Sequence, residues 1–156
     1  MNYMTIIKDD LINGEGARCS LFVSGCSHGC PGCFNEESWD YRTGNKFSQE
    51  TIDIILNELS KSYVAGLSLL GGDPLMPKNI DEVLNLCRIV KETYPNKNIW
   101  CWSGYTLDEI KENHAKPMLE YIDVLVDGKF IEELKDLKLP FRGSSNQRVL
   151  YKETDF

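Results

Sequence analysis

Short apolar runs alternate with segments of helical periodicity along most of the chain, and this alternation restricts the fold more than any other feature. Apolar residues recur at i, i+3, i+4 and i+7 after Ser48 and again after Asn79, which predicts two helices. Thr106 and Glu109 form a capping box for a third helix, which ends at 114–117. A short helix is expected at 130–138, and strands are expected at 19–24, 67–70, 99–102, 122–126 and 148–151. This order predicts right-handed βαβ units and a parallel sheet.

The length of the chain sets the size of that sheet. The 156 residues form one predicted domain, 1–156, and fall well short of the ~250 residues of a closed eight-stranded barrel. We therefore expect an α/β fold in which a single-domain parallel sheet forms a truncated, open partial (β/α) barrel.

Each of the first four predicted strands ends in a glycine-containing loop. The glycines are Gly25, Gly71 with Gly72, Gly104 and Gly128. Ligands of parallel sheets bind beyond the carboxyl ends of the strands. The chemistry of the protein is therefore expected at the edge where these loops meet.

Charge and hydropathy narrow the class of partner and the compartment. The net charge of −7 disfavours a nucleic-acid module, which neutralises phosphates with clustered Lys and Arg. No apolar run approaches the ~18 residues that span a bilayer, and the first residues lack the apolar core of a signal peptide. A cytoplasmic protein with neither a membrane nor a nucleic-acid partner is expected, with its six cysteines in a reducing compartment.

Three cysteines follow the first predicted strand closely. Cys26, Cys30 and Cys33 have C-x3-C-x2-C spacing, and thiolates are soft ligands that suit iron–sulfur clusters or zinc. Cys19 would lie about 16 Å away at the far end of its strand. The two remaining cysteines, Cys87 and Cys101, fall on apolar faces and are expected in the core.

Three thiolates on a four-iron cluster leave one iron without a protein ligand, which is how a catalytic centre differs from a closed structural one. In its spacing and its place after a strand, the cysteine loop resembles that of the radical S-adenosylmethionine enzymes. The resemblance implies a 4Fe–4S cluster whose open iron binds the amino and carboxylate groups of S-adenosylmethionine. It also implies cleavage of the sulfonium and a 5′-deoxyadenosyl radical. The alternatives are a zinc site that uses His28 as well, and a redox-inert loop.

One position departs from the superfamily pattern. The residue before the third cysteine is usually aromatic and lies near the adenine, whereas this chain has Gly32 there and the aromatic Phe34 one residue after Cys33. The resemblance makes Phe34 the candidate for the adenine contact.

The glycine loop after the second predicted strand resembles the superfamily's Gly-Gly-Glu motif, with Asp73 in place of the glutamate. The resemblance implies that Gly71, Gly72 and Asp73 bind the amino group of S-adenosylmethionine. An ordinary turn is the alternative.

Two further strand ends supply candidates for the cofactor pocket. Trp102 and Gly104 end the third predicted strand and line either this pocket or the packed edge of the sheet. Asp127 and Lys129 end the fourth and reach either the cofactor or, for Asp127, the start of a helix.

Within the superfamily, the chain resembles the activating proteins of anaerobic ribonucleoside-triphosphate reductase, a family that itself tends to carry glycine at position 32. The resemblance runs from residue 13 to 147 through blocks in the family's order: 13–26, 30–35, 71–74, 102–105, 127–130 and 142–147. It implies an oxidoreductase that installs a glycyl radical on the large reductase subunit, with flavodoxin as electron donor. The last block would serve the fold or the partner contact.

Three alternatives to this function remain open. The first is the activase of another glycyl-radical enzyme, such as pyruvate formate-lyase, although such relatives are generally longer. Outside the enzyme class, a zinc-stabilised binding module would contain zinc without iron. A ferredoxin-like electron carrier would need a fourth thiolate.

Overall fold

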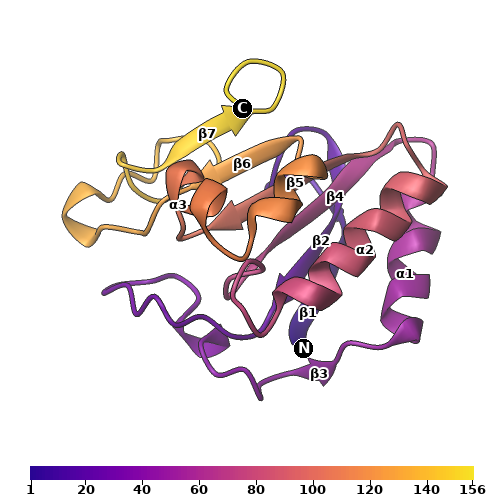
Figure 1. Cartoon of the computed structure of the whole chain (residues 1–156), viewed down its shortest axis with the longest axis horizontal. Helices are drawn as coiled ribbons and strands as arrows, with labels where there is room; N and C mark the ends of the chain where they lie inside the picture. Colours follow the sequence, from indigo (N-terminus) through magenta and orange to yellow (C-terminus); the bar gives the residue numbers. More distant parts are fainter.

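The computed structural model describes all 156 residues and has an α/β fold built on one mixed sheet (Figure 1). The strand order is β3-β1-β2-β4-β5-β6-β7. The strands are β1 (Asn2–Asp10), β2 (Ala17–Val23), β3 (Asn45–Lys46), β4 (Val64–Gly71), β5 (Asn98–Ser103), β6 (Val124–Asp127) and β7 (Arg148–Tyr151). The helices are α1 (Gln49–Leu59), α2 (Ile80–Thr93) and α3 (Leu107–Glu112). No helix is both long and apolar enough to cross a membrane.

The sheet is mixed, which corrects the expected all-parallel sheet. The central strands β2, β4, β5 and β6 are parallel, as predicted from the βαβ spacing. At the two sides of this group, β1 pairs antiparallel with β2, and β7 pairs antiparallel with β6. The strand β1 was not predicted at all, because its side chains are mostly half-buried or exposed and give no clear apolar run.

The helix expected at 130–138 is also wrong. The segment contains only a 3-10 turn at Glu132–Leu134, none of whose residues is buried. Its apolar side chains Ile131, Leu134 and Leu137 are exposed. A short helix in water needs an apolar face packed against the protein, and in this segment only Phe130 is buried.

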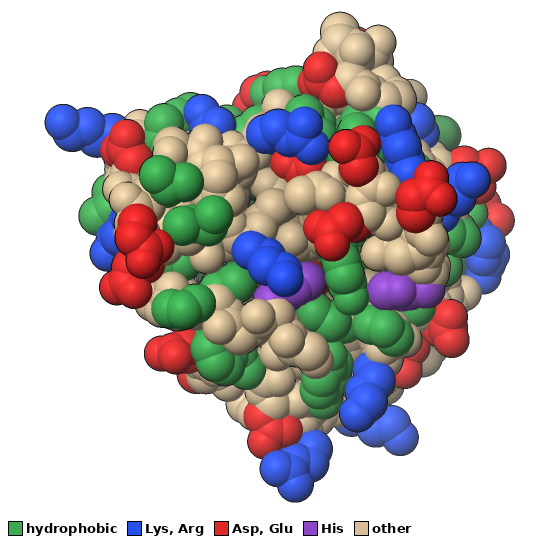
Figure 2. Space-filling model, turned by 60° about the vertical axis from the view of Figure 1, so that its left-hand side comes forward, with side chains coloured by type: hydrophobic (Ala, Val, Ile, Leu, Met, Phe, Trp, Pro, Cys, Tyr) green, Lys and Arg blue, Asp and Glu red, His purple; other side chains and the backbone are tan.

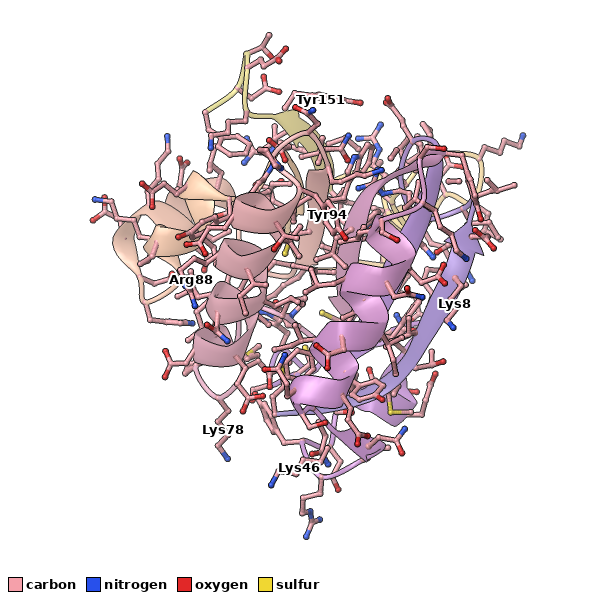
Figure 3. All side chains as sticks on the ribbon, turned by 90° about the vertical axis from the view of Figure 1, so that its right-hand side faces the viewer. Lys8, Lys46, Lys78, Arg88, Tyr94 and Tyr151 are labelled. Atoms are coloured by element: carbon pink, nitrogen blue, oxygen red, sulfur yellow. The ribbon has the colours of Figure 1, made fainter.

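The three helices lie on one face of the sheet, where the main core forms. A row of fully buried side chains crosses the parallel strands in register: Leu21, Leu69, Cys101 and Leu125. The apolar faces of α1 and α2, which lie side by side in Figure 3, pack against such rows. The predicted capping box begins α3, since the Glu109 N–H donates to Thr106 Oγ1 and the Thr106 N–H donates to Glu109 Oε1.

The opposite face of the sheet has a different lining. Trp100 packs against Trp102 and against Phe141, which belongs to the segment before β7. Nearer the carboxyl ends of the strands, this face presents a second row of apolar side chains, namely Phe22, Leu70, Trp102 and Val126. This second row forms the floor of the main cavity.

Candidate functional site

The loops that follow β2, β4, β5 and β6 meet around one cavity of about 440 Å³. The expectation that these glycine loops share an edge of the sheet is therefore confirmed. Most of the residues singled out from the sequence line this cavity: Cys26, Cys30, Cys33, Phe34, Gly71, Gly72, Asp73, Trp102 and Gly104. Asp127 and the exposed Lys129 do not.

Cys26, Cys30 and Cys33 of the cysteine loop line this cavity, and no other cysteine does. Cys26, Cys30 and Cys33 are free and half-buried. The other three cysteines, defined here as the core cysteines, are fully buried between the sheet and the helices: Cys19, Cys87 and Cys101. Burial raises the pKa of Cys26 to about 12 and also raises that of Cys30. Three soft donors on one cavity wall fit an iron–sulfur cluster that keeps one iron free of protein thiolate.

The histidine of the cysteine loop turns toward the sheet. His28 Nε2 lies 2.7 Å from Asp73 Oδ2, and the two side chains are 6% and 1% exposed. No group of three His, Cys, Asp or Glu side chains converges as the ligands of a single ion would. The zinc alternative, which required His28 beside the thiols, therefore has no geometric support.

Asp73 receives more hydrogen bonds than any other side chain at the cavity. Its Oδ2 accepts from Ser103 Oγ at 2.9 Å and from the Gly104 N–H at 2.9 Å, besides His28. Its Oδ1 accepts from the Leu75 N–H at 2.9 Å. The carboxylate therefore joins the loops that follow β2, β4 and β5.

The backbones of the first two loops are in direct contact. The Gly72 N–H donates to Val23 O and the Asp73 N–H donates to Gly25 O, both at 2.8 Å. A Cβ on Gly72 would lie 2.5 Å from the Gly25 carbonyl oxygen, so only glycine fits there. Because Cys26 directly follows Gly25, this contact places the Gly71-Gly72 loop next to the cysteine loop.

The aromatic candidates are held by the segment that precedes β7. Trp102 Nε1 donates to the Phe141 carbonyl at 2.7 Å. The half-exposed Phe34 ring packs 5.0 Å from the ring of Phe130. Both rings border the cavity and give it apolar walls.

Asp127 lies at the end of β6, with its carboxylate engaged away from the cavity. The side chain is 1% exposed and accepts from the Leu107 N–H, at the start of α3, at 2.8 Å. Arg148 of β7 donates to it through Nε at 3.0 Å and through Nη2 at 2.5 Å. No helix begins at Asp127, since only the 3-10 turn Glu132–Leu134 follows it; the carboxylate instead joins the start of α3, 20 residues earlier, to β7.

Arg142 is a cavity residue that the sequence did not single out as a ligand. It is the one Lys or Arg side chain among the residues that line the cavity. Its Nη1 donates to the Gln147 carbonyl at 2.7 Å, and its buried Nε has no partner. Its place in the 142–147 block was the available signal, but the pattern alone did not indicate where the side chain points.

Figure 2 brings forward the left-hand side of Figure 1, where the cysteine loop and the segment near residue 130 lie. Hydrophobic side chains lie among scattered charges on this face, and the two histidines of the chain are both visible. No single sign of charge dominates the face.

Known proteins similar to this chain also indicate an iron–sulfur cluster. A family model described as a 4Fe-4S single cluster domain matches residues 12–150. The chain is 48% identical to the anaerobic ribonucleoside-triphosphate reductase-activating protein of Haemophilus influenzae, over 96% of this chain and 97% of that protein. It is 47% identical to the protein of that name from Enterobacteria phage T4 (99% and 96%) and 46% identical to that from Escherichia coli K12 (96% and 97%). At this identity over nearly the full length of both chains, the protein belongs to the family of anaerobic ribonucleoside-triphosphate reductase-activating proteins.

Proposed function

We propose that the protein is a radical S-adenosylmethionine oxidoreductase that generates a glycyl radical on the large subunit of anaerobic ribonucleoside-triphosphate reductase. One observation carries the proposal: the three-thiol loop and the Gly71-Gly72 loop line the same cavity at one edge of the sheet. The names of the relatives and the 4Fe-4S family model support the same function.

Cys26, Cys30 and Cys33 would hold the cluster. Bound there, the cluster would supply the one-electron reduction of S-adenosylmethionine from which formation of a glycyl radical on the partner follows. The core cysteines are enclosed by the sheet and helices, so one iron would remain free of protein ligands. An open position of this kind is what a catalytic metal centre needs.

Three features of the cavity suit the remaining groups of S-adenosylmethionine. The backbone carbonyls of Gly71 and Gly72, two residues that line the cavity, would receive its amino group. Arg142, the one cationic side chain that lines the cavity, would pair with its carboxylate. Phe34 and Trp102 supply apolar walls for the adenine and the methionine carbons.

The cavity is open on one side, and we infer that the partner protein completes it. Four parallel strands with an antiparallel strand on each side form less than a closed barrel, which supports a truncated partial (β/α) barrel. Three exposed apolar side chains, defined here as the rim, belong to the loop before β2 and the segment after β6: Leu11, Ile12 and Leu137. Ile12 and Leu137 also line the cavity. A partner that brings a glycine into contact distance would bury this rim.

The electron donor and the compartment follow from the same proposal. A one-electron donor such as flavodoxin would reduce the cluster. The six cysteines form no disulfide, which suits the reducing cytoplasm. With a net charge of −7, we expect no nucleic-acid partner. Since no apolar run approaches the ~18 residues that span a bilayer, we expect no membrane partner.

The test is anaerobic reconstitution with iron and sulfide, followed by reduction and a search for methionine and 5′-deoxyadenosine. The glycyl radical on the large subunit is measured by electron paramagnetic resonance. Cys30→Ala should lose the cluster absorption, the cleavage and the radical together, whereas Cys87→Ala, a matched change in the core, should keep all three. Cleavage at the wild-type rate by Cys30→Ala, or a cluster signal that S-adenosylmethionine leaves unchanged in the wild-type protein, would contradict the proposal.

A further inference from the structure

The carboxylate of Asp73 is crowded by protein donors: Oδ2 accepts three hydrogen bonds and Oδ1 accepts one. An ionised carboxylate has about four lone-pair sites, and four protein donors already contact this one. The side chain is 1% exposed, although Asp73 is among the residues that line the cavity. An ammonium group would have to compete with these donors, whose hydrogen bonds to a charged acceptor are among the stronger kinds.

His28 supplies one of those four donors from the middle of the cysteine loop. Because a carboxylate only accepts, the proton of this hydrogen bond lies on Nε2 of the imidazole. The ring packs edge-on against Tyr105, with centroids 4.7 Å apart. On its other side lies Gly104, where an added Cβ would come within 2.4 Å of the ring. The imidazole is therefore clamped in one position.

This arrangement connects the thiols to the sheet. His28 lies between Cys26 and Cys30, so a fixed imidazole fixes the backbone from which both thiols extend. Ser103 and Gly104 bind the same carboxylate oxygen from the end of β5. The cysteine loop contains no helix or strand between Val23 and Glu36, so such contacts hold it in place.

We propose that Asp73 is a positioning residue that ties the cysteine loop to the sheet through His28, rather than a ligand of the amino group of S-adenosylmethionine. The amino group is then left to the backbone carbonyls of Gly71 and Gly72. This inference rests on the proposed function and changes one role that the sequence resemblance implied. The pair acts on the cluster before any S-adenosylmethionine is present.

The experiment therefore begins with the reconstituted protein alone. The variants are His28→Ala, Asp73→Asn, the double variant and His28→Gln, whose amide retains an N–H donor. The matched control is His114→Ala, because His114 also packs against Tyr105 and hydrogen-bonds the Leu75 carbonyl but does not touch Asp73. The readouts are the rate of iron loss to a chelator, the signal of the reduced cluster in electron paramagnetic resonance, and the affinity for S-adenosylmethionine.

We expect His28→Ala and Asp73→Asn to lose iron about tenfold faster than wild type and to share an altered cluster signal, since each breaks the same charge-assisted hydrogen bond. The double variant should be no worse than Asp73→Asn alone, because the His28–Asp73 interaction is already lost in that variant. His28→Gln should recover most of the wild-type behaviour, and His114→Ala should match wild type.

A direct role for Asp73 gives the opposite pattern. Asp73→Asn would then bind S-adenosylmethionine weakly with a normal cluster, and His28→Ala would match wild type in all three readouts; that result would overturn the inference. So would a His28→Gln variant as defective as His28→Ala. If these results came with normal cleavage by wild type, the proposed function would stand, whereas a wild-type protein that forms no cluster would overturn both.

Discussion

Asp127→Asn tests whether the carboxylate at the end of β6 serves the fold or the cofactor. Asp127 lies on β6 and joins it to two other elements. Its carboxylate accepts from the first N–H of α3 and from Nε and Nη2 of Arg148 on β7. We expect the variant to lower the free energy of unfolding and to leave the affinity for S-adenosylmethionine unchanged.

The magnitude follows from the exposure of the partners. Breaking a fully buried ion pair costs about 3–5 kcal/mol, but the Arg148 side chain is 51% exposed and can be hydrated again. The amide oxygen of the substituted side chain would keep part of the hydrogen bonding and lose the charge. The loss of two hydrogen bonds to a charged acceptor, reduced by this hydration, amounts to about 2 kcal/mol. At about 2–4 °C per kcal/mol for a chain of this size, the Tm should fall by about 4–8 °C.

The assay is thermal unfolding of the cluster-free protein by circular dichroism, together with binding of S-adenosylmethionine to the reconstituted protein. Arg148→Gln is the matched variant, since it removes the other partner of the same pair. The double variant should lose less stability than the two single variants added together. An unchanged Tm with S-adenosylmethionine binding weakened more than tenfold would refute this reasoning, because Asp127 would then be a cofactor ligand.

Three further outcomes are expected. Burial raises the pKa of Cys19 and Cys87 from 9.0 to about 12, so these thiols ionise above pH 9 in the unfolded chain but stay protonated in the fold. The stability of the cluster-free protein should therefore fall above pH 9 by about 1.4 kcal/mol per pH unit for each thiol, with no contribution below pH 9, and Cys87→Ala should reduce the slope in pH-dependent urea unfolding. Gly104→Ala should displace the His28 ring by about 1 Å, because ordinary contact with the new Cβ begins near 3.4 Å and the ring now lies 2.4 Å away; iron loss to a chelator should then match that of His28→Ala. Leu137→Asp should reduce glycyl-radical formation on the large subunit at least tenfold while S-adenosylmethionine cleavage continues, whereas Ile54→Asp on the exposed side of α1 should affect neither.

The sequence predicted the local elements well wherever a repeating pattern faced a core. The helices α1 and α2 and the parallel strands follow from apolar periodicity, and α3 follows from a capping box. These signals depend on residues within a few positions of one another. The strand β1 and the irregular segment after β6 lack such signals, because the first is stabilised by pairing with β2 and the second packs few of its side chains.

For the site, the sequence alone determined the three thiols and the glycine loops, since spacing and strand order place them at one edge of the sheet. The tertiary structure decided where the charged side chains go. The carboxylate of Asp73 meets an imidazole 45 residues earlier in the chain, and that of Asp127 meets a guanidinium 21 residues later. Residue type specifies that a buried carboxylate must find donors, but only the packing of distant segments determines which donors lie within hydrogen-bond distance.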